Sequence, residues 1–455
     1  MIRKLTLKDL AWPIFVENSL ARGMGIVNIF LLSKYNMEAV AAVGVANQLG
    51  MFINMLFMFV TLGTAVVVSQ YLGAGNKERA ATASSVAVVL NTGIGITVGL
   101  LVLLFHHPIL IMMGLTGQVL AYTGTYFTIV GGLCVLQGLN FTFGTIMRNY
   151  GKARAPMFVF LGMNLFNLVG NTVIILRPFG LPDLGLAGIA GWTAFTQSMG
   201  LVAMIACALH YKIRLHLDRP FPTAVIREIL RIGIPGSGDN LAYSIANISL
   251  TFFLTAFGTT ALASFAYASN LIGFVQTIGY SVGQGTQILV GRLVGAGKFD
   301  EAYRLGFRAT WIAMSWNISV MVCLMIFQQP ILRLFTSNAE VMEIVFWCFI
   351  IDLVLEFGRP FNLVIGCSVR GAGDVKWSIA ISLFSILLVL IPLGFVFTRV
   401  IPLGVPGVFL ALCVDEWLRG QLMTWRWRTR KWERAVLVKP IYMNFAKESA
   451  EAQDI

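Results

Sequence analysis

The sequence has 455 residues, of which 57% are hydrophobic and only 12% are charged, and its formal net charge is +12. The charged share is about half that of a typical soluble domain, and the mean hydropathy is +0.79. This composition excludes a soluble globular domain of ordinary type and indicates a chain with many membrane-spanning segments.

Long apolar stretches recur along the whole chain. A helix needs about 20 residues to cross roughly 30 Å of hydrocarbon, because it rises about 1.5 Å per residue. We expect an all-α integral membrane protein with twelve transmembrane helices. They are predicted near residues 11–32, 47–72, 84–105, 120–146, 157–177, 187–209, 233–257, 265–291, 307–327, 341–368, 377–398 and 405–425.

The basic residues predict how the helices are oriented. If the amino terminus is cytoplasmic, alternate loops and the two termini hold 27 of the 33 Lys and Arg residues, as short cytoplasmic loops should. We therefore expect both termini in the cytoplasm and a multi-pass protein of the plasma membrane, most simply a bacterial inner membrane. The positive charge then faces anionic lipid headgroups and is no indication of a nucleic-acid partner.

The sequence repeats itself at an offset of 222 residues. The offset places Pro13 on Pro235 and Arg148 on Arg370, and it superimposes VSQYLGAGNKERA (68–80) on VGRLVGAGKFDEA (290–302). A constant offset over about 140 residues indicates duplication of a six-helix unit. We expect two pseudo-symmetric six-helix bundles, related by an axis along the membrane normal because six crossings return the chain to the same side. The predicted parts are an N-lobe (1–209, helices 1–6), a cytoplasmic linker (210–232), a C-lobe (233–430, helices 7–12) and a cytoplasmic tail (431–455).

The two GAG segments resemble the multidrug and toxic compound extrusion (MATE) family. LAWPIFVENSL, AVAAVGVANQL, RGAGDVK and the closing DEWLRG extend the likeness over most of the chain. The resemblance implies two six-helix bundles around a central cleft and antiport of a substrate against protons or sodium. Many members carry an Asp in the first helix, where this chain has Asn28. Since an amide cannot ionise, the coupling role of that carboxylate does not carry over to Asn28, and we consider other acids for ion coupling.

Charged residues inside the predicted helices are the best functional markers, because each costs about 2.5 to 3.5 kcal/mol on insertion scales. Glu17 and Asp239 are related by the offset, and each is followed by an Asn. The predicted tenth helix carries several polar residues along one face, whereas the equivalent positions of the fourth helix are uncharged. We therefore expect ion coupling mainly in the second lobe. The predicted coupling residues are Asp352, Glu356, Asp239, Glu17 and Asp415.

A structural role for the same charges is the alternative reading. Glu356 paired with Arg359, and Asp415 paired with Arg419, would simply lock helices together. The acids predicted inside the bilayer nevertheless outnumber the arginines there. At least one carboxyl group should then lack a full partner and be able to exchange a proton.

The function predicted from these residues is ion-coupled antiport of small amphipathic, often cationic, compounds by alternating access. The alternative is a flippase for a lipid-linked precursor or an exporter of one metabolite, in which Arg22 and Arg359 would hold an anion. We expect no enzyme activity, no metal site, no cofactor besides the coupling H⁺ or Na⁺, and a monomer that contacts membrane lipids and its substrate. The predicted substrate-binding residues are Glu17, Asn18, Asn28, Gln48, Asp239, Asn240, Tyr243, Asp352, Glu356, Arg359 and Asn362.

Overall fold

The structure is a computed structural model that describes residues 5–177, 182–216, 222–333 and 335–437. Within these ranges the chain is helical and contains no strand. It divides into two compact units. Unit 1 comprises Met1–Phe15, Ser69–Asn76 and Ile234–Ile455, and unit 2 comprises Val16–Val68 and Lys77–Gly233. The predicted tail lies outside the described residues from position 438 onward, as does part of the predicted linker.

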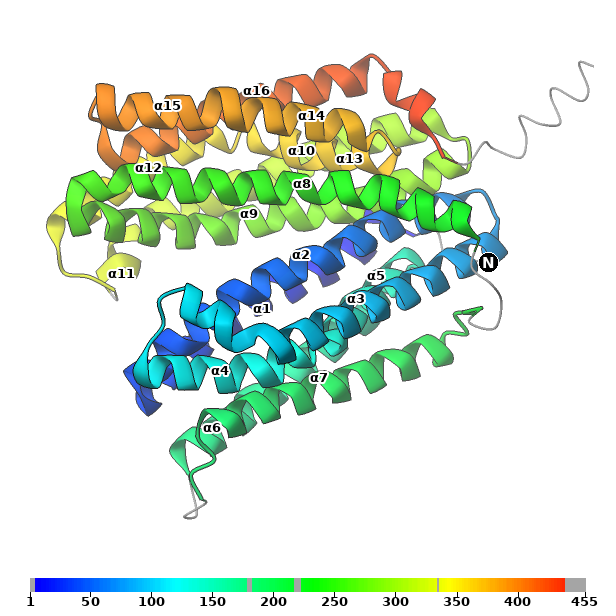
Figure 1. The fold of residues 1–455 in the computed structure, drawn as a ribbon. Helices are drawn as coiled ribbons and strands as arrows, with labels where there is room; N and C mark the ends of the chain where they lie inside the picture. Colours follow the sequence, from blue (N-terminus) through cyan, green and yellow to red (C-terminus); the bar gives the residue numbers. More distant parts are fainter. Residues whose placement is uncertain (1–4, 178–181, 217–221, 334, 438–455) are drawn as a thin grey trace, which may run out of the picture. The chain divides into compact units, whose positions relative to one another are not determined.

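Unit 2 is a bundle formed by the first half of the chain (Figure 1). Two of its helices extend beyond it, because the first residues of α1 and the last turn of α2 belong to unit 1. Its helices are α1 (Leu7–Tyr35), α2 (Met37–Gly73), α3 (Lys77–Met112), α4 (Gly117–Gly132), α5 (Cys134–Asn149), α6 (Arg154–Leu176) and α7 (Gly185–His210).

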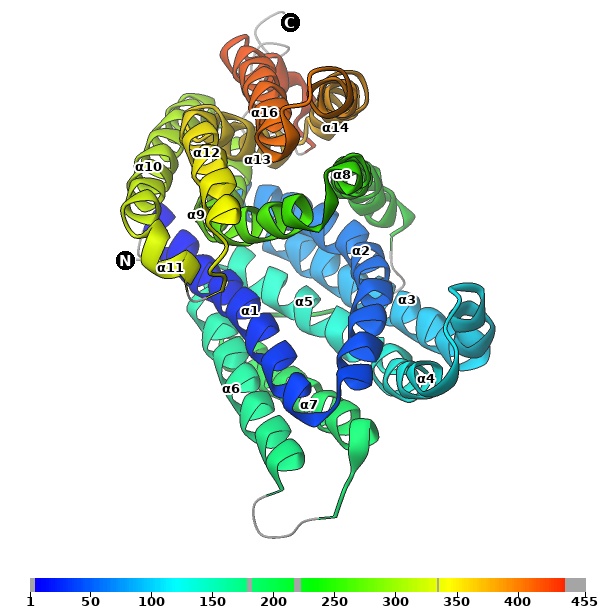
Figure 2. The same ribbon diagram turned by 90° about the vertical axis from the view of Figure 1, so that its left-hand side faces the viewer.

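Unit 1 is a second bundle, in which the helices from α8 to α16 lie side by side (Figures 1 and 2). Its elements are α8 (Thr223–Leu254, of which the part up to Gly233 belongs to unit 2), η2 (Thr255–Phe257), α9 (Gly258–Gly295), α10 (Phe299–Ile326), α11 (Gln328–Arg333), α12 (Ala339–Leu355), η3 (Phe361–Ile365), α13 (Gly366–Gly371), α14 (Val375–Ser385), η4 (Ile386–Leu390), α15 (Ile391–Phe395), η5 (Val396–Val400), α16 (Gly404–Arg428) and η6 (Lys431–Ala435). Of these, η3, η4 and η5 are π-helical turns.

Each of the twelve predicted helices has a counterpart among the described residues, but two predictions of continuous helices are wrong. The predicted helix 120–146 is broken at Leu133, where α4 and α5 meet at 43°. The predicted helix 341–368 stops as α12 at Leu355, and the chain becomes helical again at Arg359 and Pro360, ahead of η3. The ring of Pro360 removes a backbone donor and crowds the preceding turn. The offset of 222 relates Leu133 to Leu355, so the two repeats break at the same place.

The membrane-spanning character is clear from length and composition. Eight helical stretches of the described residues can cross a membrane, or nine if α4 and α5 form one bent span, and one of the eight joins α8 to α9. The helices α12 and α16 are not included in this count. The break leaves α12 only 17 residues long, which is shorter than the about 20 residues that a span needs. Three charged residues near the centre of α16, Asp415, Glu416 and Arg419, lower its mean hydropathy.

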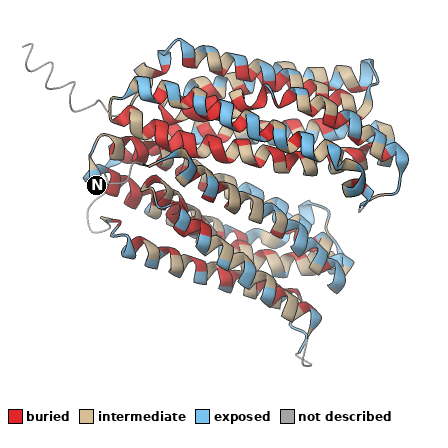
Figure 3. Cartoon of the chain, turned by 180° about the vertical axis from the view of Figure 1, so that it is seen from behind, coloured by how far each residue is buried: buried red, intermediate tan, exposed pale blue. Residues whose placement is uncertain are grey.

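The outer faces of both bundles are apolar. Leu104 on α3 is 71% exposed and Leu388 in η4 is 64% exposed, and Figure 3 shows exposed residues spread over the outward helix faces with the buried ones inside each bundle. In water, such extended apolar faces would associate, whereas lipid tails are as apolar as leucine and tolerate them. The protein is therefore an all-helical membrane protein.

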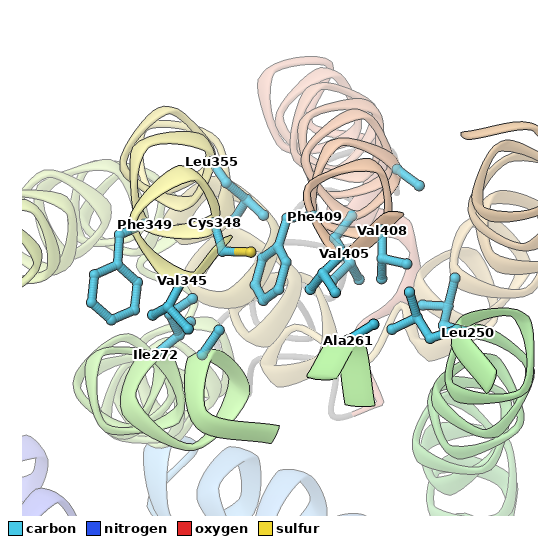
Figure 4. Close-up of a cluster of buried hydrophobic side chains, with 14 of the residues drawn as sticks. Leu250, Ala261, Ile272, Val345, Cys348, Phe349, Leu355, Val405, Val408 and Phe409 are labelled. Carbon is cyan, nitrogen blue, oxygen red and sulfur yellow. The ribbon is translucent and has the colours of Figure 1, made fainter. Parts of the chain in front are cut away.

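The largest buried apolar cluster of unit 1 joins α8, α9, α12 and α16. Figure 4 shows Val345 and Cys348 of α12 beside Phe409 of α16, with Ile272 of α9 beneath Val345. These side chains are almost fully buried. They fix α12 against α16 on the same helices that carry the buried charges described below.

The two GAG motifs end their helices in the same way. Gly75 after α2 and Gly297 after α9 adopt left-handed φ values of 76° and 73°, which glycine reaches without a steric penalty. The backbone N–H of Asn76 then donates to the carbonyl of Tyr71, and that of Lys298 donates to the carbonyl of Leu293. Both are Schellman-type helix ends.

Gly73 and Gly295, the first glycines of the two GAG motifs, let the backbones of α2 and α9 approach each other closely inside unit 1. A Cβ on Gly73 would lie 2.0 Å from the carbonyl oxygen of Arg292, and a Cβ on Gly295 would lie 2.0 Å from the carbonyl oxygen of Gln70. The offset relates Gly73 to Gly295 and Gln70 to Arg292. The repeated motif thus lets the end of α2 cross the end of α9 at backbone distance.

Candidate functional site

A cluster of buried charges begins where α12 breaks. Arg359 lies just after the break and reaches back to both acids predicted on this helix. Its Nη2 is 2.8 Å from Asp352 Oδ1, and its Nη1 pairs with Glu356 Oε1. All three side chains are at most 4% exposed. The break therefore lets one guanidinium bind two carboxylates that stand four residues apart.

A second group of charges lies on α16. Arg419 Nη2 pairs with Asp415 Oδ2 and lies 3.2 Å from Glu416 Oε1. These residues are also buried. The ion pairs Glu356–Arg359 and Asp415–Arg419 of the structural reading are thus present, but each arginine serves two acids instead of one.

Uncharged polar side chains anchor the two groups of charges to neighbouring elements. Asn362 Nδ2 donates to Glu416 Oε2 at 2.7 Å, which links η3 to α16. Asn317 of α10 donates to Glu356 Oε2 at 2.8 Å, and Ser385 of α14 donates to Asp415 Oδ1 at 2.6 Å. The sequence analysis did not predict Asn317 or Ser385 as site residues. A single polar residue on an apolar helix does not indicate which side chain it will contact. We call the residues Asp352, Glu356, Arg359, Asp415, Glu416 and Arg419 the acid cluster.

The acid cluster contains more acids than bases. Four carboxyl groups share two guanidinium groups, so the fully ionised cluster would carry a charge of −2. Among the described residues, Asp352 Oδ2 has no hydrogen-bond partner, and neither has the Nε of Arg359. Burial and neighbouring negative charge both oppose such an excess. Protonation of a carboxyl group, or a bound small cation, would relieve this excess of negative charge.

A second type of ion pair, between an acid near the start of a repeat and an arginine near the end of its broken helix, is found in both repeats. In unit 2, Arg148 Nη2 lies 2.5 Å from Glu17 Oε1. In unit 1, Arg370 Nη1 lies 3.6 Å from Asp239 Oδ2, and Arg370 also donates to Ser378 Oγ at 3.1 Å. The offset relates both members of one pair to those of the other. Arg148 lies near the end of α5 and Arg370 near the end of α13, each just beyond the predicted helices 120–146 and 341–368.

The first repeat contains a pocket, and some of its lining residues are related by the offset to acid-cluster residues of the second repeat. It measures about 180 Å³ and lies wholly within unit 2. Its lining includes Val130, Cys134 and Gln137, which the offset relates to Asp352, Glu356 and Arg359. We call it the amide pocket. Its full lining is Ala46, Asn47, Gly50, Ile53, Asn54, Tyr126, Phe127, Val130, Gly131, Cys134, Gln137, Thr193 and Gln197.

The remaining predicted substrate residues are not gathered in either site. Gln48 is exposed, and Asn18, Asn28 and Tyr243 are half-buried. The Oδ1 atom of Asn28 is buried without a hydrogen-bond partner among the described residues. The side chain of Asn240 lies outside what the structure describes. Within the described ranges, no three His, Cys, Asp or Glu side chains are arranged to hold a metal ion.

Comparison with known proteins defines the class. The MatE family model matches residues 13–173 and 235–396, so the two matched stretches begin at the prolines that the internal repeat superimposes. The chain belongs to the MATE family of transporters. It is 35% identical to the "Uncharacterized transporter YisQ" of Bacillus subtilis over 94% of this chain and 95% of the relative. It is 27% identical to the "Probable multidrug resistance protein NorM" of Thermotoga maritima over 96% of this chain and 95% of that protein.

Solved structures share the fold. A structure described as the outward-facing conformation of a multidrug resistance MATE family transporter superimposes with a TM-score of 0.86, at 20% identity, over 93% of this chain and 95% of that chain. A transporter from Pyrococcus furiosus, described as having a binding pocket of reverse polarity, gives a TM-score of 0.84 at 20% identity over 93% and 95%. The predicted MATE-like fold and the resemblance are both confirmed, and the family consists of transporters, not enzymes.

Proposed function

We propose that this MATE family transporter is an antiporter that exports small amphipathic, often cationic, compounds in exchange for protons or sodium ions by alternating access. The observation that carries the proposal is the acid cluster. Four buried carboxyl groups around two arginines cannot all stay ionised at low cost. Such a site binds a proton or a sodium ion and releases it when its surroundings change, which is what coupling requires.

The amide pocket supports the substrate half of the proposal. Its polar groups are amides, hydroxyls and one thiol, beside Tyr126 and Phe127. Such a lining suits an aromatic or aliphatic compound that also forms a few hydrogen bonds. We propose that part of the substrate occupies this pocket, while the ion stays in the acid cluster of the other repeat.

The alternative of an anion-carrying flippase relied on Arg22 and Arg359. Arg359 is buried and already binds two carboxylates, so it offers little to a further anion. Arg22 is exposed. The charge pattern therefore favours cation coupling over anion transport.

The loop charges and the repeat support the rest of the proposal. We propose a bacterial inner-membrane protein that works as a monomer, with both termini in the cytoplasm. Residues 1–209 and 233–430 then form the two lobes that alternate around the substrate, and the chain from 210 to 232 connects them.

Inverted membrane vesicles test this function directly. We expect a labelled lipophilic cation to accumulate when the vesicle interior is made acidic, or when it is loaded with more sodium than the outside, because the coupling ion then leaves as the substrate enters. One of the two gradients should be effective. Vesicles without the protein give the background. Uptake that neither gradient accelerates would overturn antiport, and transport of a lipid-linked sugar instead of the cation would favour the flippase. Asn28→Asp should leave uptake unchanged, since coupling is proposed to lie elsewhere.

A further inference from the structure

A basic hollow lies at the end of α16, away from the acid cluster. It measures about 290 Å³ and is lined by Arg426 of α16 and by Lys431, Arg434 and Ala435 of η6. Three of these four residues are cations, and no acid is among them. Neither the transport function nor the family assignment gives this hollow a role.

The segment that forms the hollow is rigidly attached. Trp432 of η6 is fully buried, stacks on Trp427 of α16 at 4.2 Å between ring centroids, and donates its Nε1–H to the carbonyl of Trp427 at 3.0 Å. Beyond η6, the backbone N–H of Leu437 donates to Gln70 Oε1 at 3.1 Å, and Gln70 Nε2 donates to the carbonyl of Gly371 at 3.0 Å. The cations are thus held on a preformed frame, which lowers the entropic cost of binding a ligand.

The chemistry of the hollow fits a phosphate group. Arg426 uses its Nε to bind Asp374 Oδ2 at 2.7 Å, and its guanidinium lies over the Trp377 ring at 4.9 Å. A guanidinium has five N–H donors, so the other four remain for an anion. With Lys431 and Arg434, and with Asp374 counted against them, the site carries a charge of about +2.

The surroundings of the hollow identify where such a phosphate comes from. Trp425 is 47% exposed at the end of a membrane helix, 5.7 Å from Trp377 between ring centroids. The ammonium of Lys431 lies 5.0 Å over the Trp425 ring. Tryptophan beside basic residues is typical of the membrane–water interface, where anionic headgroups attract lysine and arginine. Inorganic phosphate would make no contact of its own with these rings, whereas a lipid places its glycerol and upper acyl region beside them.

We propose that this hollow binds the phosphate of an anionic phospholipid headgroup. Arg426 and Arg434 contact the phosphate oxygens, Lys431 adds a third positive charge, and the Trp425 ring lies against the glycerol and upper acyl region. A bound lipid connects η6 to α16 and so strengthens the segment that also holds Gln70. The transporter is therefore expected to be more stable in membranes that contain anionic lipid.

The test measures thermal unfolding of the purified full chain in mixed micelles of dodecyl maltoside with phosphatidylglycerol or phosphatidylcholine. We expect phosphatidylglycerol to raise the melting temperature in a saturable way and phosphatidylcholine to leave it unchanged. The variant K431Q/R434Q changes two exposed side chains, and its apparent affinity for phosphatidylglycerol should fall at least tenfold. The variant K431R/R434K keeps the charges and should restore the response.

The matched control is R304Q/R308Q, which removes the same charge from two exposed residues of α10. It should respond to phosphatidylglycerol as the unmodified protein does. Equal loss in both double variants would overturn the proposal, since it would show a diffuse charge effect. The proposal would also be wrong if inorganic phosphate alone gave the same stabilisation, or if both lipids acted equally.

Discussion

The two repeats differ most at the break in their fourth helix. In the second repeat, Asp352, Glu356 and Arg359 fill this region with buried ion pairs. In the first repeat, the equivalent residues Val130, Cys134 and Gln137 line a hollow of about 180 Å³. The fourth helix of each repeat is interrupted at the same position. Beside the interruption, the second repeat carries buried charged side chains and the first repeat has an uncharged pocket.

What both repeats retain shows which features the fold itself requires. The Schellman-type ends and the reciprocal contacts of Gly73 and Gly295 occur in both copies. So does the pairing of an acid on an early helix with an arginine near the end of the broken one. The acid cluster and the amide pocket are not shared by the two copies. This difference is why we propose the first for ion coupling and the second for substrate selection.

The largest effect is expected from Arg359→Gln. Removing this guanidinium leaves Asp352 and Glu356 buried without their common partner, which should cost about 3 to 5 kcal/mol. Thermal unfolding in detergent should show a markedly lower melting temperature and gradient-driven export should be lost. Arg22→Gln, at an exposed position, is the control and should change stability little. An unchanged melting temperature for Arg359→Gln would mean that the acids are already neutral.

Gly295→Ala tests the crossing that both repeats share. The added Cβ would lie 2.0 Å from the carbonyl oxygen of Gln70, so the helices must separate, at a cost of about 1 to 3 kcal/mol. Gly93→Ala is a suitable control, because a Cβ there meets no atom within 4 Å. Equal melting temperatures for the two variants would contradict a close contact between α2 and α9.

Gln137→Arg tests the amide pocket, because it gives the first repeat the arginine that the second repeat has at the equivalent position, Arg359. The amide pocket would then hold a cation without nearby carboxylates, so the KM for a cationic substrate should rise about tenfold, or about 1.4 kcal/mol. Gln137→Met has a similar size without charge and should raise KM less. The measurement is initial uptake into vesicles over a range of substrate concentrations. A KM that does not respond to the charge would remove the pocket from the substrate path.

The smallest effect concerns the two shared ion pairs. A double-mutant cycle on Glu17 and Arg148, with Gln at each position, should give a coupling energy of about 1 kcal/mol, as expected for a partly buried pair. The same cycle on Asp239 and Arg370 should give less, because the charged atoms are 3.6 Å apart instead of 2.5 Å. The reverse order of the two coupling energies would contradict the difference in geometry.

Sequence alone predicted the helices and which acids lie within them, because apolar length and intramembrane charge are local properties. The coupling role of these acids stays a prediction. It failed at the break near Leu133, where no proline interrupts the pattern and only Gly131 and Gly132 precede the bend. Tertiary packing decides such a bend.

Sequence alone also did not predict which side chains pair between different helices. Glu17 and Arg148 are 131 positions apart, and no local spacing relates them, although the common offset of both pairs was a usable signal. Gln197 and Asn47 of the amide pocket offered no signal of this kind, since isolated amides on apolar helices are as often simple helix-to-helix contacts.

The most direct test of the central claim is gradient-driven uptake into inverted vesicles by the single variants E356Q and D352N, with melting temperatures measured in parallel. Each variant leaves Arg359 one carboxylate partner, so the fold should hold, while an amide cannot exchange a proton. We predict that substrate still binds but that neither a proton nor a sodium gradient drives uptake. Stable variants that both transport at the normal rate would contradict coupling through Asp352 and Glu356, and would move the coupling site to Asp415 on α16 or to Glu17 or Asp239 outside the acid cluster.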